Sequence, residues 1–299
     1  MHYEAVIFDL YGTLIDIHTD ERRTSLWRRM ARFLRYQGVY AEAEQLRELF
    51  FAAVRYSQRS SPEPFPEVNL LAVWRALLGE LGYRGLDVQV VPMVQLFRAL
   101  SMRRFSLFAD TRPCLETLRP HYTLGVVSDA QRLFLEPEMA MLGLAHYFDT
   151  LVVSSDFGYR KPDARLFGHM LETLSVPPAR ALYVGDNPLR DISGARNAGM
   201  AAVLLQRPGV FPYELSETTP DATIASLREL PGLLAELRER KCAEEGACIS
   251  TQAHASRLRL TAMWSIIPGC VPYGFRRGNN ARAASKARLV PVLPRSKVR

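Results

Sequence analysis

The chain has 299 residues, of which 48% are hydrophobic and 23% charged, enough for one large domain or two smaller ones with a sizeable buried core. No run of eighteen apolar residues occurs, so the sequence predicts no membrane span, and the amino terminus lacks the pattern of a secretory signal. Four cysteines in this length do not indicate a disulfide framework. We therefore expect a cytoplasmic protein.

The net charge of +7 is unevenly distributed along the chain. Residues 241–299 hold 11 Lys and Arg residues against 2 Asp and Glu residues, so residues 1–240 carry a net charge of −2. The 241–299 tail mixes Ala, Ser, Arg, Gly and Pro without a sustained hydrophobic period, which predicts low order. Because the basic charge belongs to this tail, the globular part is not expected to bind nucleic acid.

Short apolar runs alternate with helical patterns along most of the chain. The runs predict buried strands at residues 4–8, 123–127, 150–154, 181–184, 201–205 and 222–225. A last helix is predicted over 227–238. Buried strands that alternate with helices indicate βαβ units and a parallel sheet covered on both faces. We expect an α/β fold with a Rossmann-like core formed by residues 1–15 and 109–240.

Residues 16–108 interrupt this alternation. Apolar residues at helical spacing predict helices over about 20–37, 41–57, 69–80 and 88–103, with a loop at 60–66. The sequence therefore predicts an all-helical cap inserted after the first strand. An insertion at that point lies above the carboxyl edge of the sheet, where open α/β folds bind ligands.

Polar residues that could carry chemistry follow the predicted strands. Gly12 permits a close backbone approach after the first strand. Lys161 is the only lysine in residues 1–240, and its compact ammonium suits a contact with a carboxylate or a phosphate oxygen. The other candidates are Asp9, Thr13, Ser128, Asp129, Asp186, Asn187 and Asp191. Local capping of helices and turns is the alternative role for Asp9, Ser128 and Asp191.

Three of these carboxylates are expected at one edge of the sheet, namely Asp9, Asp186 and Asp191. Such a cluster is costly unless a cation neutralises it, and hard oxygen ligands favour Mg²⁺. The sequence therefore predicts a magnesium site at this edge.

These segments resemble, in order, the four motifs of the haloacid dehalogenase superfamily of hydrolases. The matching residues are Asp9 with Gly12-Thr13-Leu14, Ser128, Lys161-Pro162, and Gly185-Asp186 with Asp191, and the resemblance covers about residues 4–230. It implies a Rossmann-like core with a helical cap, and an Asp9 nucleophile that forms a covalent aspartyl intermediate.

The resemblance also implies roles for the remaining site residues. Ser128 and Lys161 would hold the substrate anion, and Thr13 belongs with them in the catalytic set. Gly12, Asp129 and Asn187 are candidates for substrate binding. In phosphatase members the late acidic residues hold Mg²⁺, here Asp186 and Asp191 with Asp9, and the backbone carbonyl of Tyr11 would complete the set.

The first motif departs from the phosphatase pattern at Tyr11. Phosphatases of this superfamily carry an aspartate there that acts as general acid and base. A phenol, with a pKa of ~10, is poorly suited to replace a carboxyl group with a pKa of ~4 in that role. The Asp9-x-Tyr11-Gly12-Thr13 form is instead similar to the 2-haloacid dehalogenase branch. That branch usually has Ser-Asn at the second motif, where this chain has Ser128-Asp129.

We therefore expect a Mg²⁺-dependent phosphatase of small organophosphates, acting as a monomer or homodimer on a small-molecule substrate. A dehalogenase-like hydrolase of 2-halo acids is the second hypothesis. A binding or regulatory protein of the same fold with little turnover is the third. The arginines predicted on the first cap helix, which include Arg28, Arg29, Arg32 and Arg35, are candidates for the substrate-binding arginine of a dehalogenase cap.

Overall fold

The computed structural model of this chain describes residues 3–208 and 216–237, all within one compact unit. The tail predicted to have low order, 241–299, lies outside the described residues. None of the described helices is long and apolar enough to span a membrane. The cytoplasmic location stays a prediction.

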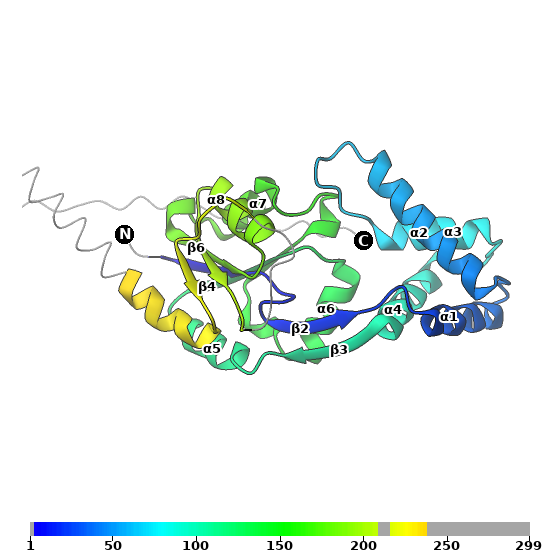
Figure 1. Cartoon of the computed structure of the whole chain (residues 1–299), viewed down its shortest axis with the longest axis horizontal. Helices are drawn as coiled ribbons and strands as arrows, with labels where there is room; N and C mark the ends of the chain where they lie inside the picture. Colours follow the sequence, from blue (N-terminus) through cyan, green and yellow to red (C-terminus); the bar gives the residue numbers. More distant parts are fainter. Residues whose placement is uncertain (1–2, 209–215, 238–299) are drawn as a thin grey trace, which may run out of the picture. The chain divides into compact units, whose positions relative to one another are not determined.

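A six-stranded parallel sheet forms the core (Figure 1). Its order is β5-β4-β1-β6-β7-β8, with β1 among the central strands. The strands are β1 (Ala5–Phe8), β4 (Thr123–Ser128), β5 (Thr150–Val153), β6 (Ala181–Gly185), β7 (Ala201–Leu205) and β8 (Ala222–Ile224). Each coincides with a predicted apolar run within two residues, which confirms the Rossmann-like α/β core.

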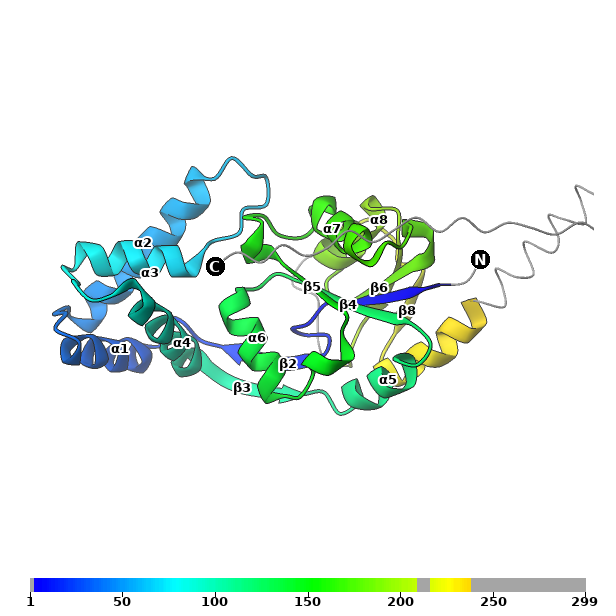
Figure 2. The same ribbon diagram turned by 180° about the vertical axis from the view of Figure 1, so that it is seen from behind.

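Helices cover both faces of this sheet, as the views in Figures 1 and 2 agree. Val6 and Phe8 of β1 pack into one apolar cluster with α5 (Thr111–Leu118) and α6 (Arg132–Met141). Residues of η6 (Leu227–Glu229) and the helix that follows it join this cluster. Ala5 and Ile7 face the opposite cluster, with α7 (Ala164–Leu174) and α8 (Gly194–Asn197). The alternation explains why β1 is apolar at every position.

Four helices form the cap with an apolar core of their own. They are α1 (Thr24–Tyr36), α2 (Ala43–Ser60), α3 (Leu70–Glu80) and α4 (Val90–Ser101), with a short turn η1 (Asp87–Gln89) before α4. The rings of Trp27, Phe50, Trp74 and Phe97 meet at the centre, with Phe50 and Phe97 centroids 4.9 Å apart. Aromatic rings bury large areas each, so this cluster stabilises the cap.

The connection between cap and core differs from the prediction of helices alone. β2 (Ile15–Thr19) and β3 (Met102–Leu107) pair antiparallel and carry the chain into and out of the four helices (Figure 1). Ile17, Phe105 and Leu107 pack against the core cluster. Phe105 and Leu107 alternate with the exposed Ser106, which is the period of a strand. The helix predicted over 88–103 overlaps β3 at Met102 and Arg103, and no strand was predicted for the rest of β3.

Candidate active site

The carboxyl ends of three neighbouring strands bring the predicted site residues together. Asp9 follows β1, Ser128 ends β4 and Asp186 follows β6, and β1 pairs with both of the other strands. Because the strands are parallel and in register, these ends meet at the same edge of the sheet. The structure therefore confirms that the first, second and fourth motifs converge.

Lys161 lies at the centre of this edge and is 3% exposed. Its Nζ donates hydrogen bonds to Asp9 Oδ1 at 2.7 Å and to Asp191 Oδ1 at 2.6 Å. A third bond goes to the hydroxyl of Tyr183 at 3.1 Å. Burial alone would lower the pKa of Lys161, but the carboxylates of Asp191 and Asp9 outweigh it and raise the pKa. Lys161 is thus a permanent ammonium in contact with the predicted nucleophile.

Asp9, Asp186 and Asp191 place carboxylate oxygens within 4.8 Å of one another. Burial and the carboxylates of Asp191 and Asp186 raise the pKa of Asp9 while Lys161 opposes them, and together they bring it to about 8. Three carboxylates therefore share one ammonium in a buried site, and they need more positive charge than the protein supplies. Hard oxygen donors in this arrangement fit a divalent cation such as Mg²⁺.

The loop after β1 is shaped around Asp186. The hydroxyl of Thr13 donates to Asp186 Oδ1 at 3.2 Å. Gly12 has φ +91°, and a Cβ at this position would lie 2.5 Å from Asp186 Oδ2. Both the conformation and the close approach require glycine. Burial and the Asp191 carboxylate raise the pKa of Asp186 to about 6.

A buried ion pair between Arg207 and Asp110 contacts this loop. Arg207 donates to both carboxylate oxygens of Asp110, at 2.9 and 3.0 Å, and to the backbone carbonyl of Thr13 at 2.9 Å. Asp110 also accepts from the hydroxyl of Ser226 at 2.7 Å and the N–H of Leu227 at 2.9 Å. This contact ties the first motif to the segment that follows β8.

Asp191 and Ser128 do not have the helix-capping role that was the alternative for them. Asp191 is 1% exposed and accepts the backbone N–H of Asn187 at 2.9 Å in addition to Lys161. Asn187 is itself the cap, since its side chain accepts the N–H of Arg190 at 2.8 Å at the start of the wide turn η5 (Pro188–Ser193). Ser128 is fully buried, and its hydroxyl has no hydrogen-bond partner among the residues that the structure describes.

Tyr11 points its side chain away from the carboxylate cluster. Its hydroxyl donates to Glu138 Oε2 at 2.5 Å, and Arg98 donates to Glu138 Oε1 at 2.7 Å. Burial and the Glu138 carboxylate raise the pKa of Tyr11 above its usual range. The phenol is thus held as a neutral donor to Glu138. Only the backbone of Tyr11 is left for a role beside Asp9.

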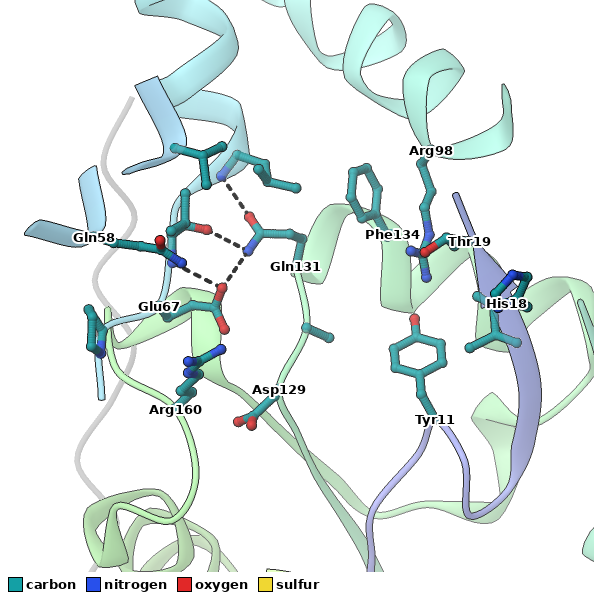
Figure 3. Close-up of a pocket in the computed structure, with 16 residues that line it drawn as sticks. Tyr11, His18, Thr19, Gln58, Glu67, Arg98, Asp129, Gln131, Phe134 and Arg160 are labelled. Atoms are coloured by element: carbon teal, nitrogen blue, oxygen red, sulfur yellow. Dashed lines mark hydrogen bonds between the residues drawn. The ribbon is translucent and has the colours of Figure 1, made fainter. Parts of the chain in front are cut away.

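A cavity of about 520 Å³ lies between the cap and the core, and Tyr11 and Asp129 line its core side. Tyr11 lies two residues after Asp9 and Asp129 directly follows Ser128, so the cavity adjoins the two loops that carry these motif residues. Figure 3 shows Glu67, Arg160 and Asp129 on one side and Arg98, His18 and Tyr11 on the other. A substrate group attached to the reacting centre has room here.

Arg98 was not among the site residues predicted from the sequence, although a signal for it was present. Arg98 is the only charged residue in the apolar helix α4, and it lines the cavity. The arginines proposed from the sequence, Arg28, Arg29, Arg32 and Arg35, are exposed on α1 and do not line it.

The segment before α3 closes the other side of the cavity. Gln131 donates to the carbonyl of Val68 at 2.7 Å and to Glu67 Oε1 at 3.1 Å, and it accepts the N–H of Leu70 at 2.9 Å. Ser154 donates to Glu67 Oε2 at 2.6 Å. The cap is therefore attached to the core by polar bonds beside the cavity as well as by the β2–β3 ribbon.

Comparison with known proteins agrees with this geometry. The family model of the haloacid dehalogenase-like hydrolases matches residues 3–199. The chain belongs to this family. It is therefore an enzyme, a haloacid dehalogenase-like hydrolase, and the resemblance carried by its four motifs is confirmed.

The chain is similar in sequence to a named phosphatase and in fold to solved dehalogenase and phosphatase structures. It is 36% identical to a phosphoserine phosphatase of Thermus thermophilus over 172 residues, which cover 55% of this chain and 68% of the relative. The fold is similar to a crystal structure of 2-haloacid dehalogenase from Pseudomonas syringae, with a TM-score of 0.57 and 25% identity over 79% of this chain and 99% of that one. A HAD phosphatase of Thermococcus onnurineus gives a TM-score of 0.52 and 25% identity over 77% and 97%.

Proposed function

We propose that this hydrolase is a Mg²⁺-dependent phosphatase of small organophosphates. The observation that carries the proposal is the contact of Lys161 with both Asp9 and Asp191, beside a third carboxylate, Asp186. A displacement of halide needs no such excess of negative charge around the nucleophile. A phosphate ester does need a cation, because its own charge would otherwise add to that of the cluster.

Asp9, Asp186, Asp191 and the backbone carbonyl of Tyr11 would hold the Mg²⁺ ion. When bound, it supplies positive charge that neutralises the carboxylates and the phosphate oxygens. The residues present fit this role, since each offers a hard oxygen donor and three of them already lie within 4.8 Å of one another.

In the proposed reaction Asp9 attacks the phosphorus atom and forms an aspartyl phosphate, which water then hydrolyses. Lys161 keeps its ammonium next to Asp9 and holds a phosphate oxygen. The buried hydroxyl of Ser128, which has no partner in the described part of the chain, is suited to donate to another. The cavity between cap and core receives the rest of the substrate and limits the access of bulk water.

The second motif favours this proposal over dehalogenation, because it has Asp129 where the 2-haloacid dehalogenase branch usually has asparagine. The likeness to a phosphoserine phosphatase supports the same choice.

A 2-haloacid dehalogenase-like activity remains the second candidate because of Tyr11. Displacement of a halide needs no acid at that position, and a 2-haloacid dehalogenase is among the similar structures. A protein that binds such ligands without efficient turnover is the third candidate.

One screen separates the three candidates. The purified chain is incubated with a panel of phosphate monoesters and 2-halo acids, with Mg²⁺ or with a chelator, and released phosphate and halide are measured. Release of phosphate that needs Mg²⁺ supports the proposal. Release of halide in the presence of chelator would replace it by the second candidate, and ligand binding without any release by the third.

Two variants control the screen for contaminating activity. Asp9→Asn removes the nucleophile and is expected to abolish release. Asp156→Asn changes an exposed aspartate that pairs with Arg132 at the same edge of the sheet, outside the cavity, and is expected to behave as the wild type. Activity retained by Asp9→Asn would contradict the assignment of Asp9.

A further inference from the structure

An alkyl phosphate releases an alkoxide unless a proton is supplied to the leaving oxygen. The position that carries the acid in related phosphatases is Tyr11, whose hydroxyl is occupied by Glu138 at 2.5 Å. The proposed function therefore needs another acid beside Asp9. This acid must line the cavity that receives the leaving group. It must also have a carboxyl oxygen that accepts no hydrogen bond from the protein.

Asp129 meets these requirements. It directly follows Ser128 at the end of β4 and lines the cavity opposite Tyr11. Its Oδ1 accepts the backbone N–H of Lys161 at 2.8 Å, which fixes the carboxyl group next to the residue that touches the nucleophile. Its Oδ2 is buried and has no hydrogen-bond partner among the described residues.

The charges around Asp129 are compatible with a protonated carboxyl group. Burial raises its pKa, Asp191 acts in the same direction, and Lys161 and Arg190 oppose them. The guanidinium of Arg190 lies 3.9 Å from Oδ2, beyond hydrogen-bond distance. The carboxylate of Asp129 in turn raises the pKa of Glu67 in the cap segment. Oδ2, which accepts no hydrogen bond from the described residues, is thus in a site that favours a proton.

We propose that Asp129 is the general acid and base of the phosphatase reaction, in place of the residue at position 11. This inference rests on the proposed function. As Asp9 attacks, the P–O bond to the leaving group breaks, its electron pair goes to the leaving oxygen, and that oxygen takes the proton of Asp129. The Asp129 carboxylate then takes a proton from the water that attacks the aspartyl phosphate. The second P–O bond breaks, and Asp9 is released as a carboxylate with inorganic phosphate.

Asp129→Asn is a sharp test because the amide oxygen can still accept the N–H of Lys161 and only the ionisable group is lost. The variant and the wild type are compared with Mg²⁺ on an alkyl phosphate, phenyl phosphate, p-nitrophenyl phosphate and 2,4-dinitrophenyl phosphate. A general acid contributes roughly 10²–10⁴-fold where the leaving oxygen needs a proton. We expect a loss of that order in kcat/KM for the alkyl ester and almost none for the dinitrophenyl ester.

The readouts distinguish catalysis from positioning and from misfolding. Activity of Asp129→Asn on the dinitrophenyl ester shows that it is folded and that Asp9 still attacks. Equal losses on all four esters, or no loss on the alkyl ester, would overturn the assignment of Asp129. Asp156→Asn, the matched control, should show no dependence on the leaving group. A wild type that releases phosphate from none of the esters would overturn the proposed function, and this inference with it.

Discussion

The hydroxyl of Tyr11 donates a 2.5 Å hydrogen bond to Glu138 of α6, and Glu138 is also bound by Arg98 of the cap helix α4. The residue two positions after the predicted nucleophile therefore belongs to a contact between cap and core. Glu138 is 3% exposed, so the hydrogen bonds from Tyr11 and Arg98 both offset the cost of burying its charge.

We expect Tyr11→Phe to lower the free energy of unfolding by about 1–3 kcal/mol, because a buried carboxylate oxygen loses a donor. The turnover of an activated phosphate ester should stay close to that of the wild type, since the phenol takes no part in the reaction. Urea unfolding and steady-state kinetics measure the two effects. Tyr56→Phe, at a residue 74% exposed, is the control and should change neither. A Tyr11→Phe enzyme of full stability and no activity would refute this interpretation.

The stability of the metal-free protein should fall as the pH rises. The pKa of Asp9 is raised from 3.8 to about 8 in the folded protein, so the folded state binds a proton more tightly than the unfolded state between these values. Unfolding then becomes easier as Asp9 ionises on the way to about pH 8. Thermal unfolding in chelator across this range measures the slope.

Asp9→Asn should flatten this slope and unfold at a higher temperature than the wild type near pH 8, although it is inactive. Mg²⁺ should stabilise the wild type more at high pH than at low pH, because it binds the ionised carboxylates. A wild type whose stability in chelator is constant between pH 5 and pH 8 would show that the charge of Asp9 is already compensated.

Asp110→Asn should destabilise the protein by about 3–5 kcal/mol, because it leaves the guanidinium of Arg207 without its buried carboxylate. The pKa of Asp110 is lowered by its bonds from Arg207 and Ser226, which outweigh burial. Its contribution is therefore present at neutral pH and lost as the pH falls through that lowered pKa. Chemical unfolding at neutral pH measures the loss. Glu42→Gln, which breaks the exposed pair with Arg35, should cost less than about 1 kcal/mol.

Gly12→Ala should impair catalysis more than folding. The added methyl group would meet Asp186 at 2.5 Å, at a backbone φ of +91° that disfavours alanine. We expect weaker binding of Mg²⁺, measured as a higher Mg²⁺ concentration for half-maximal rate. Gly38→Ala, where φ is +82° but no atom lies within 4 Å of the added group, isolates the backbone effect. Equal behaviour of the two variants would mean that the contact with Asp186 is unimportant.

The sequence was sufficient to predict the core sheet and to predict that four site residues converge, namely Asp9, Ser128, Lys161 and Asp186. Apolar strands covered on both faces leave a clear local signal, and polar residues directly after them must meet at one edge. Contacts between distant segments leave no such signal. The hydrogen bond between Tyr11 and Glu138 joins residues far apart in the chain. Likewise, neither the composition nor the hydrophobic period of the sequence indicates that Arg207 pairs with Asp110.

Lys161 also determines how the protein can be probed by chemistry on amines. It is the only lysine in residues 1–240, it is 3% exposed, and its proton is held by two carboxylates. Acylation needs the free amine, so this residue should resist reagents that label ordinary lysines. The rate at which residue 161 is modified in the intact protein would therefore report how often the active site opens, without any knowledge of the substrate.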